Sequence, residues 1–326
     1  MAYPDTDVLV IGAGVSGLST ALALLDSGLT VSIYAAGLPH RVTSGAAGAL
    51  WGIHMVGEDE RISGWANQTF EHFRALAEDP RTGIHEISGV EAYLDRLPEP
   101  PLLPTGLDSL SKADPHSLPA DYRAGWRYRA PIIAMPEYLD YLVDQVIGGG
   151  GLLQLGRPWP SLDHAAEHCA ARIIVNCTGI GARGFVPDEA MVPVRGQIVV
   201  VANPGITEFF IGERLEPDEI TYIFPHGSTA VLGGTEQPGN ASTTPDPAIA
   251  TRIVRSCADI EPKLATAPVL GHRVGLRPAR PRVRLETTRL ASGRPVVHNY
   301  GHGGAGVTLS WGCAQSVKAE VLAVLA

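Results

Sequence analysis

A strand, a glycine turn and a helix follow one another at the start of this chain. Four apolar residues run directly into Gly-Ala-Gly-Val-Ser-Gly at 12–17, and a second apolar stretch follows. In such a unit Gly12 allows the tight turn, Gly14 lets the backbone approach a pyrophosphate, and Gly17 lets the helix pack against the strand. A second strand at 30–34 closes a βαβ unit. The pattern predicts a Rossmann-type dinucleotide site, with the phosphates at the helix N-terminus.

The composition limits the partners and the location that the chain can have. Its 326 residues predict about two domains, and 45% hydrophobic with 18% charged residues is typical of a globular enzyme. A net charge of -9 argues against nucleic acid or an anionic lipid surface as a partner. The apolar run that ends at Leu25 is too short to span a membrane. With no leader visible at the N-terminus, we expect a cytoplasmic protein.

The cysteines show no pattern of a metal site. They have no C-x-x-C spacing and no histidine at metal-ligand distance, so we expect buried thiols and neither disulfides nor a bound metal. The chain has four of them: Cys169, Cys177, Cys257 and Cys313.

Two later segments extend the nucleotide site. The apolar run at 172–176 shows no alternation, which is typical of a parallel strand buried on both faces. Its glycine-rich end at 177–181 would lie at the carboxyl edge of the sheet, where open α/β sheets bind ligands. A strand at 295–300 and a glycine loop at 301–306 precede a helix predicted from 307 to about 325. Such a loop suits an anion or a polar carbonyl edge.

The middle of the chain has a different pattern. Segments 192–201 and 221–234 are predicted as antiparallel strands, the second as a hairpin. Helices are predicted at 62–79 and 136–147, and the segment 97–119 is expected to be an irregular surface excursion. Both ends of the chain therefore build the nucleotide domain, and antiparallel material is inserted between them. This interleaving is typical of flavoproteins.

These motifs together resemble the D-amino-acid oxidase family of FAD enzymes. The matching segments are Val-Ile-Gly-Ala-Gly-Val-Ser-Gly-Leu-Ser-Thr-Ala at 10–21, Ala-Leu-Trp at 49–51, Val-Asn-Cys-Thr-Gly at 175–179, Arg-Gly-Gln-Ile at 195–198, Gly-Leu-Arg-Pro-Ala-Arg-Pro-Arg-Val-Arg-Leu-Glu at 275–286 and His-Asn-Tyr-Gly-His-Gly-Gly-Ala-Gly-Val-Thr at 298–308. The resemblance implies an α/β fold in which a Rossmann-type FAD-binding domain is interleaved with a substrate domain on a mixed, largely antiparallel β-sheet. The FAD-binding domain is expected at 1–52, 134–190 and 283–326, and the substrate domain at 53–133 and 191–282.

The resemblance also implies three substrate-binding residues. Arg277 would hold the substrate α-carboxylate, because a guanidinium fork fits a carboxylate with two parallel hydrogen bonds. A structural salt bridge is the alternative for this arginine. Tyr222 would hydrogen-bond the same carboxylate, unless it is an ordinary strand aromatic, and the carbonyl of Gly304 would accept from the substrate amine. In the same loop His302 is expected to be a turn histidine bonded to backbone rather than a catalyst.

The implied reaction is oxidative deamination of a D-amino acid to a 2-oxo acid, ammonia and hydrogen peroxide. Once the carboxylate and the neutral amine are held, hydride leaves Cα for flavin N5 without a protein base, and molecular oxygen reoxidises the flavin. FAD is expected to contact Gly12, Ala13, Gly14, Val15, Ser16, Arg41, Thr43, Ser44, Gly48, Leu50, Thr178, Gly179, Arg277, Gly303, Gly304, Gly306, Val307 and Thr308.

Two departures from the family pattern change these expectations. Animal members carry an acid for the ribose at the end of the second strand, where this chain has Ala36. The ribose must then be met by Arg41 or by backbone, and FAD affinity is expected to be lower. Between Phe210 and Tyr222 the second lid tyrosine of animal members is missing, and Asp218 falls near its place. The shorter segment implies a more open site.

Glu236 bears on the choice of substrate. D-Aspartate oxidases, which resemble the segment 221–225, carry an arginine directly after Gly-Gly-Thr, where this chain has Glu236. A glutamate reaching the pocket would repel an acidic substrate and favour a basic one. The alternative is that it faces solvent, as most glutamates do. We therefore hypothesise that neutral or basic D-amino acids are preferred to D-aspartate.

Other functions stay open at this point. A glycine or sarcosine oxidase begins with the same glycine motif, but the segments 275–281 and 298–304 disfavour it. A D-aspartate oxidase, or a flavin dehydrogenase that passes electrons to a carrier, would share most of the same residues. A non-catalytic FAD-binding protein is disfavoured by the retention of Arg277 and Tyr222. The antiparallel strands could also form a dimer face, so a homodimer is compatible with the sequence.

Overall fold

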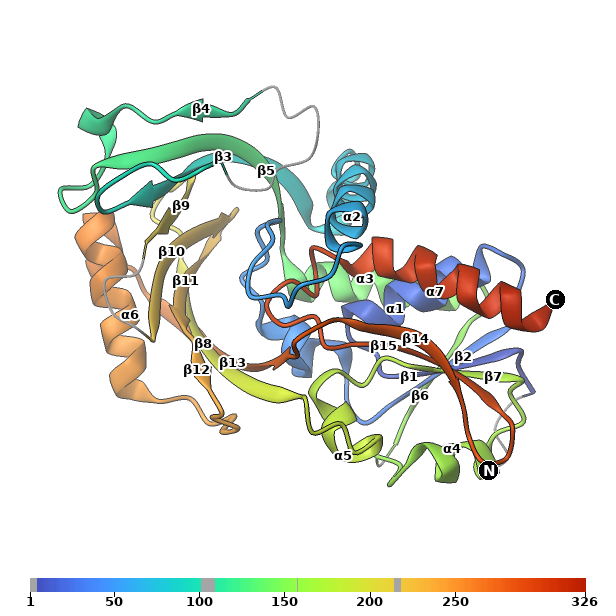
Figure 1. Cartoon of the computed structure of the whole chain (residues 1–326). Coiled ribbons are helices and arrows are strands. Elements are labelled where there is room, and N and C mark those ends of the chain that lie inside the picture. Colours follow the sequence, from blue (N-terminus) through green and yellow to red (C-terminus); the bar gives the residue numbers. More distant parts are fainter. Residues whose placement is uncertain (1–4, 101–108, 157, 214–217) are drawn as a thin grey trace.

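The chain forms two β-sheets with helices packed around them (Figure 1). The computed structural model describes residues 5–100, 109–156, 158–213 and 218–326. No helix in these ranges is both long enough and apolar enough to cross a membrane. All four cysteines are buried free thiols, as predicted.

A six-stranded sheet joins the two ends of the chain, in the order β14-β15-β7-β1-β2-β6. Every neighbouring pair is parallel except β14 with β15. Val8 and Val10 belong to the core on one face of the sheet, and Leu9 and Ile11 to the core on the other. The strands are β1 (Val8–Ile11), β2 (Val31–Ala35), β6 (Leu152–Leu155), β7 (Ile173–Asn176), β14 (Arg284–Arg289) and β15 (Pro295–Tyr300). Burial on both faces explains why β1 and β7 lack alternation.

Helices cover both faces of this sheet. On one face, apolar residues of α1, α2, α3 and α7 share a single core cluster with Val8 and Val10. On the opposite face Leu162 and Ala165 of α4 pack with Leu9 and Ile174. The helices are α1 (Val15–Leu25), α2 (Ile62–Leu76), α3 (Met135–Gly148), α4 (Leu162–His168), α5 (Ala182–Phe185) and α7 (Ser310–Leu325). This doubly wound arrangement confirms the parallel sheet that the sequence predicts.

The second sheet is mixed and largely antiparallel, as predicted. Its path is β12-β8-β11-β10-β9-β3-β5-β4, β13 pairs with β8, and β3 with β9 is a parallel pair. Its strands are β3 (Ile84–Tyr93), β4 (Ser111–Lys112), β5 (Ala124–Ile133), β8 (Val192–Ala202), β9 (Phe209–Gly212), β10 (Glu219–His226), β11 (Thr229–Thr235), β12 (Gln237–Pro238) and β13 (Val269–Ala279). The expected excursion at 97–119 contains β4, and its residues 101–108 lie outside the described ranges.

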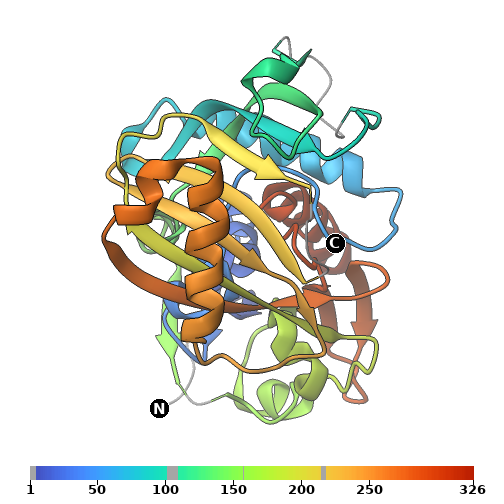
Figure 2. The ribbon, with the colours of Figure 1, turned by 90° about the vertical axis from the view of Figure 1, so that its left-hand side faces the viewer.

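The two faces of this larger sheet have different surroundings. Helix α6 (Pro247–Ile260) lies across the outer face, where Ile249, Ile253 and Cys257 pack on the strands (Figure 2). The inner face carries aromatic residues, among them Tyr222 and Phe224, and is turned toward the six-stranded sheet (Figure 1). A ligand held between the sheets would therefore contact side chains of this inner face.

The last helix differs from the prediction at its start. It begins at Ser310 and not at Val307, because the residues before it form turns fixed by tertiary contacts. The hydroxyl of Thr308 donates to the carbonyl of Gly52 over 2.7 Å, and the N–H of Leu309 donates to Ala305. No local sequence pattern reports the contact between Thr308 and Gly52. The other predicted strands and helices are present with bounds shifted by a few residues.

A buried carboxylate joins the two sheets. Asp188 accepts hydrogen bonds from Arg280 (3.0 Å) beyond β13 and from Tyr300 (2.8 Å) at the end of β15. Burial disfavours ionisation of Asp188, but these hydrogen bonds outweigh it, so the pKa of the carboxyl lies below its ordinary value. Arg284 approaches the same carboxylate at 3.7 Å. The network therefore carries its full stabilisation only while Asp188 is ionised.

We expect Asp188→Asn to lower the free energy of unfolding by about 3 kcal/mol, because it removes the charge between two partly buried guanidinium groups. A carboxyl with a depressed pKa stabilises the fold above its unfolded-state pKa, near 4, and loses that contribution as the pH falls through its folded-state pKa. Denaturant unfolding between pH 7 and 3 would show a difference between the two proteins that shrinks at the acid end. Glu208→Gln, which breaks a surface pair with Arg127, should cost less than about 1 kcal/mol. Equal losses in both variants would contradict the expectation.

Candidate active site

Two adjoining cavities lie between the sheets. The inner cavity, of about 720 Å³, is lined by Arg277 and Tyr222 from the larger sheet. The outer cavity, of about 690 Å³, is lined by the glycine turn between β1 and α1. Four residues line both cavities: Ser16, Thr43, Ser44 and Gly275. The two spaces therefore form one elongated trough, which suits a long two-part ligand.

Every residue proposed from the sequence lines this trough. The outer cavity is lined by Gly12, Ala13, Gly14, Ser16, Arg41, Thr43, Ser44, Thr178 and Gly179. The inner cavity is lined by Val15, Ser16, Thr43, Ser44, Gly48, Leu50, Tyr222, Arg277, Gly303, Gly304, Gly306, Val307 and Thr308. These residues come from both ends of the chain and from the larger sheet, so the fold brings together segments that the sequence separates widely.

The glycine turn leads directly into α1. Gly14 is the residue before the helix and has extended backbone, and the N–H of Val15 donates to the hydroxyl of Ser44 over 3.1 Å. The positive end of the helix dipole therefore faces the outer cavity, where a phosphate would be stabilised.

The far end of the outer cavity has an aromatic wall that the sequence analysis missed. Tyr34, the fourth residue of β2, and Trp159 stack with ring centroids 3.9 Å apart and planes 10° apart, and both line the cavity. Among the described lining residues there is no aspartate or glutamate. Ala36, at the position where animal members of the family carry the ribose-binding acid, lines the cavity. Arg41 lines the same cavity, as expected. An adenosine would thus meet stacked rings and a guanidinium in place of a carboxylate.

Arg277 and Tyr222 each pack against a glycine of the neighbouring strand. A Cβ at Gly196 would come within 2.5 Å of the Arg277 guanidinium, and one at Gly233 within 1.8 Å of the Tyr222 ring. Only glycine leaves room for these orientations. Phe224 stacks on Tyr222 at 4.4 Å and supports the ring from the other side.

Arg277 lacks a carboxylate partner. One N–H donates to the carbonyl of Thr235 over 2.9 Å, and no aspartate or glutamate of the described chain lies within ion-pair distance. Burial lowers the pKa of the guanidinium, but arginine stays charged in proteins. This excludes the structural salt bridge that the sequence left open, within the ranges that the structure describes. A buried, unpaired cation facing a cavity calls for an anionic ligand.

Tyr222 supplies a neutral hydroxyl next to this cation. The side chain is 7% exposed, and burial raises the pKa of its phenol to about 12 although the Arg277 charge opposes the shift. The phenol is therefore protonated at neutral pH and can donate a hydrogen bond. A guanidinium and a phenol side by side form a site for a carboxylate.

The loop that follows β15 is fixed between two other segments. The N–H of Gly303 donates to Pro278 over 2.9 Å, and the N–H of Gly304 donates to Met55 over 3.1 Å. Pro278 directly follows Arg277, so the loop and the guanidinium keep a fixed relation. His302 is buried and bonds through Nε2 to the side-chain oxygen of Asn299, and burial lowers its pKa to about 4. The partner is thus a side chain, where backbone was expected.

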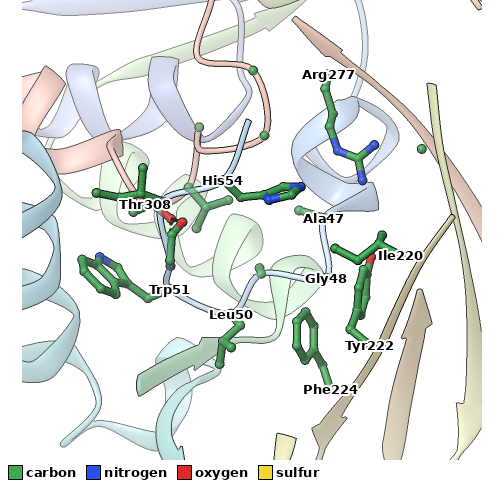
Figure 3. Close-up of a pocket in the computed structure, with 18 of the residues that line it drawn as sticks. Ala47, Gly48, Leu50, Trp51, His54, Ile220, Tyr222, Phe224, Arg277 and Thr308 are labelled. Atoms are coloured by element: carbon green, nitrogen blue, oxygen red, sulfur yellow. Dashed lines mark hydrogen bonds between the residues drawn. The ribbon is translucent and has the colours of Figure 1, made fainter. Parts of the chain in front are cut away.

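Glu236 lines neither cavity itself but pairs with His54, which lines the inner one. The glutamate is 3% exposed, so it does not face solvent, and its carboxylate pairs with Nε2 of His54. The His54 side chain lines the cavity and is 45% exposed (Figure 3). The backbone N–H of Glu236 donates to Asp218, whose own side chain is exposed. Any ligand in the cavity therefore meets an imidazole backed by a carboxylate.

A further wall of the inner cavity, formed by β3 and β5, was not predicted from the sequence. Glu91 and Tyr93 of β3 and Tyr128 of β5 line the inner cavity, and the Tyr128 hydroxyl donates to Glu91 over 3.1 Å. Residues two apart in a strand point to the same face, so the spacing of Glu91 and Tyr93 is the one sequence signal that they share a face. Nothing in the local pattern indicated that this face meets Tyr222.

Comparisons with known proteins assign the class and then the family. A family model described as FAD dependent oxidoreductase matches residues 7–319. The chain is 46% identical to a D-amino-acid oxidase of Rubrobacter xylanophilus over 97% of this chain and 96% of that protein. It is 41% identical to a D-amino-acid oxidase of Streptomyces coelicolor over 95% of each. The chain therefore belongs to the D-amino-acid oxidase family of FAD-dependent oxidoreductases, and the resemblance stated from the motifs is confirmed.

A solved structure supports the same fold. The glycine oxidase of Geobacillus kaustophilus superposes with a TM-score of 0.81 over 98% of this chain and 95% of its own, at 19% identity. At this identity the likeness concerns the arrangement of strands and helices and not the reaction.

The trough fits FAD on observations of its own. The glycine turn meets a helix N-terminus, where a pyrophosphate would be stabilised, and the stacked rings lie in the same cavity. In the inner cavity the buried indole Nε1 of Trp51 has no hydrogen-bond partner in the described part of the chain. Three side chains of α4 could share a metal ion, but none of them lines either cavity: His164, Glu167 and His168.

Proposed function

We propose that this protein oxidises D-amino acids with molecular oxygen to 2-oxo acids, ammonia and hydrogen peroxide. The observation that carries the proposal is the buried guanidinium of Arg277, which lacks a carboxylate partner in the described chain and lies beside the protonated phenol of Tyr222. An α-carboxylate fits this pair with charge-assisted hydrogen bonds. Two relatives named D-amino-acid oxidase match nearly the full length of the chain and support the same reaction.

The chain's own residues bind and orient the substrate. Arg277 and Tyr222 fix the carboxylate, and the loop at Gly304 offers carbonyls for the substrate amine. FAD, when bound, supplies the hydride acceptor. Because two points of the substrate are held, one hydrogen on Cα is directed the same way in every binding event, which is catalysis by orientation. The buried His302, bonded to Asn299, is not needed as a base.

The domain division follows the two sheets. We assign FAD binding to 1–52, 134–190 and 283–326, and substrate binding to 53–133 and 191–282. The strands of the six-stranded sheet lie in the first set and those of the larger sheet in the second, which supports the division. Helix α2 is an exception in packing, since its Trp65 donates to Ser316 of α7 over 2.8 Å.

The substrate preference that we propose is neutral or basic over acidic. The pair formed by His54 and Glu236 occupies the position where an arginine would attract an acidic side chain. Glu91 and Glu213 line the inner cavity, so an acidic substrate side chain that reached them would meet like charge, which is a repulsive element against it. A higher kcat/KM for D-aspartate than for D-alanine, D-phenylalanine or D-lysine would contradict this preference.

Anaerobic mixing of the FAD-loaded protein with matched D- and L-amino acids tests the reaction. Bleaching of the visible flavin absorbance by D-isomers alone, followed by peroxide release when oxygen is admitted, is the expected result. Bleaching by glycine or sarcosine and not by D-isomers would replace the proposal by a glycine or sarcosine oxidase. Bleaching by D-isomers without peroxide would indicate a dehydrogenase.

We expect Tyr222→Phe to raise KM for D-alanine about tenfold, because a hydrogen bond to a charged group contributes about 1.5–3 kcal/mol. The change keeps the ring that packs on Phe224, so kcat should fall less than KM rises. Steady-state kinetics by oxygen consumption measures both. Tyr141→Phe on α3, which lines neither cavity, is the matched control, and an equal effect in the two variants would rule out the carboxylate contact.

A further inference from the structure

The inner cavity has a negative end opposite Arg277. In the sheet register Tyr222 of β10 pairs with Ile211 of β9, and Ile211 pairs with Glu91 of β3. Because neighbouring strands lie about 4.8 Å apart, the backbone of Glu91 is about 10 Å from that of Tyr222 along this row. All three side chains line the cavity. Glu91 therefore faces the same cavity as Arg277 and Tyr222. Its strand, β3, lies two strands beyond β10 on the side away from β13.

The charge of Glu91 is not neutralised by a cation of the described chain. The phenols of Tyr128 and Tyr93 hydrogen-bond to it, and no arginine, lysine or histidine in the described ranges forms an ion pair with it. Burial, and then the Glu91 charge, raise the pKa of the Tyr128 phenol, so this partner stays neutral.

No nearby cation of the described chain compensates for the charge of Glu91. Arg127 and Arg129, which alternate with Tyr128 along β5, pair with Glu208 and Glu86 respectively. Glu213, just beyond β9, adds a second carboxylate to the cavity lining. Within the residues that the structure describes, this end of the cavity is therefore anionic.

We propose that Glu91 binds the cationic end of a substrate side chain, so that basic D-amino acids such as D-lysine are preferred substrates. The inference rests on the proposed function, because it needs the α-carboxylate on Arg277 and Tyr222. A molecule with a carboxylate at one end and an ammonium or guanidinium at the other matches the two poles of the cavity. An acidic side chain meets like charge there, and an apolar one leaves Glu91 without a charged ligand.

The test compares D-lysine with D-norleucine, whose side chain is similar but lacks the ammonium group. For the FAD-loaded protein we expect kcat/KM to be at least tenfold higher for D-lysine. Glu91→Gln keeps an oxygen that accepts from Tyr128 but removes the charge, and it should lower the D-lysine to D-norleucine ratio at least tenfold, mainly through KM. A ratio unchanged by this substitution overturns the inference.

Two further variants separate specificity from support of the fold. Glu86→Gln removes a charge from the same strand, but Glu86 pairs with Arg74 and Arg129 and lines neither cavity; the ratio should stay within twofold. Tyr128→Phe removes the phenol while Glu91 keeps its charge, and the preference for D-lysine should persist. A Tyr128→Phe variant with the same lost preference as Glu91→Gln would show that Glu91 acts only as an anchor for Tyr128.

The outcomes distinguish this inference from the proposed function. Oxidation of D-norleucine with no advantage for D-lysine overturns the role of Glu91 and leaves D-amino-acid oxidation standing. Absence of flavin reduction by both substrates, and by the other D-amino acids of the panel, overturns the proposed function and this inference together.

Discussion

Replacing Arg277 by alanine is expected to lower kcat/KM for D-amino acids about 1000-fold. The substitution leaves the substrate carboxylate in a buried site without its countercharge, and truncating one member of such a pair costs about 4 kcal/mol, which corresponds to about three powers of ten. Arg277→Lys keeps the charge but loses the bidentate hydrogen bonding of the guanidinium. Its kcat/KM should therefore lie between those of the wild type and Arg277→Ala. Anaerobic flavin reduction over a range of D-alanine concentrations measures the loss, and the flavin content of each variant is determined separately.

The matched control is Arg273→Lys, on the same strand. Arg273 lies four residues earlier on β13, donates to the carbonyl of Gly45 over 3.4 Å, and lines neither cavity. Its kcat/KM should remain within about threefold of the wild type, since surface and partly exposed substitutions usually have small effects. If Arg277→Ala retains more than a tenth of the wild-type kcat/KM with full flavin content, Arg277 does not bind the carboxylate.

The sequence located the cofactor end of the trough well because its signals are local. The glycines at 12 and 14 and the apolar strand before them are contiguous, and their order alone specifies a strand, a turn and a helix N-terminus. Arg277 is a different case. From the residues alone a structural salt bridge is the commoner role of an arginine, and only the fold shows that no carboxylate of the described chain pairs with it.

The residues that line the inner cavity could not all be predicted, because their meeting depends on pairing between strands that are distant in the sequence. Glu91 meets the cavity only through the parallel pairing of β3 with β9, and the register that aligns it with Tyr222 passes through a third strand. A shift by one residue would turn Glu91 to the other face. The stacking of Tyr34 with Trp159 likewise joins β2 to the segment before α4. Neither contact leaves a periodic signal in the sequence.

Burial and pairing change the role that Glu236 was expected to have in the site. Its type suggested either repulsion of acidic substrates or an ordinary surface glutamate, and both interpretations assumed an unpaired side chain. In the structure it is buried and paired with His54, so the group that contacts the cavity is the imidazole. The carboxylate that lines the cavity without a cation partner in the described chain is instead that of Glu91. Charge in this cavity is therefore set by which carboxylates have partners, and a count of acidic residues does not reveal it.

Gly14→Ala is expected to weaken FAD binding about 100-fold without unfolding the protein. Gly14 has φ −75° and ψ 179°, a conformation open to any residue, so alanine introduces no backbone strain. Its Cβ would lie 3.1 Å from the hydroxyl of Ser44, which requires a shift of a few tenths of an ångström. The new methyl group would, however, stand where the turn must let a pyrophosphate approach the backbone. The expected loss corresponds to about 2.7 kcal/mol.

Two measurements separate cofactor binding from folding in this variant. Titration of the apoprotein with FAD, followed by flavin fluorescence, gives the change in Kd, and thermal unfolding without FAD should agree with the wild type within about 2 °C, because the apo fold loses no contact. Gly148→Ala at the end of α3, where an added Cβ meets no atom within 4 Å, is the control and should bind FAD like the wild type. Tight FAD binding by Gly14→Ala would mean that the pyrophosphate does not approach this turn, and the trough would then have to hold the cofactor in another orientation.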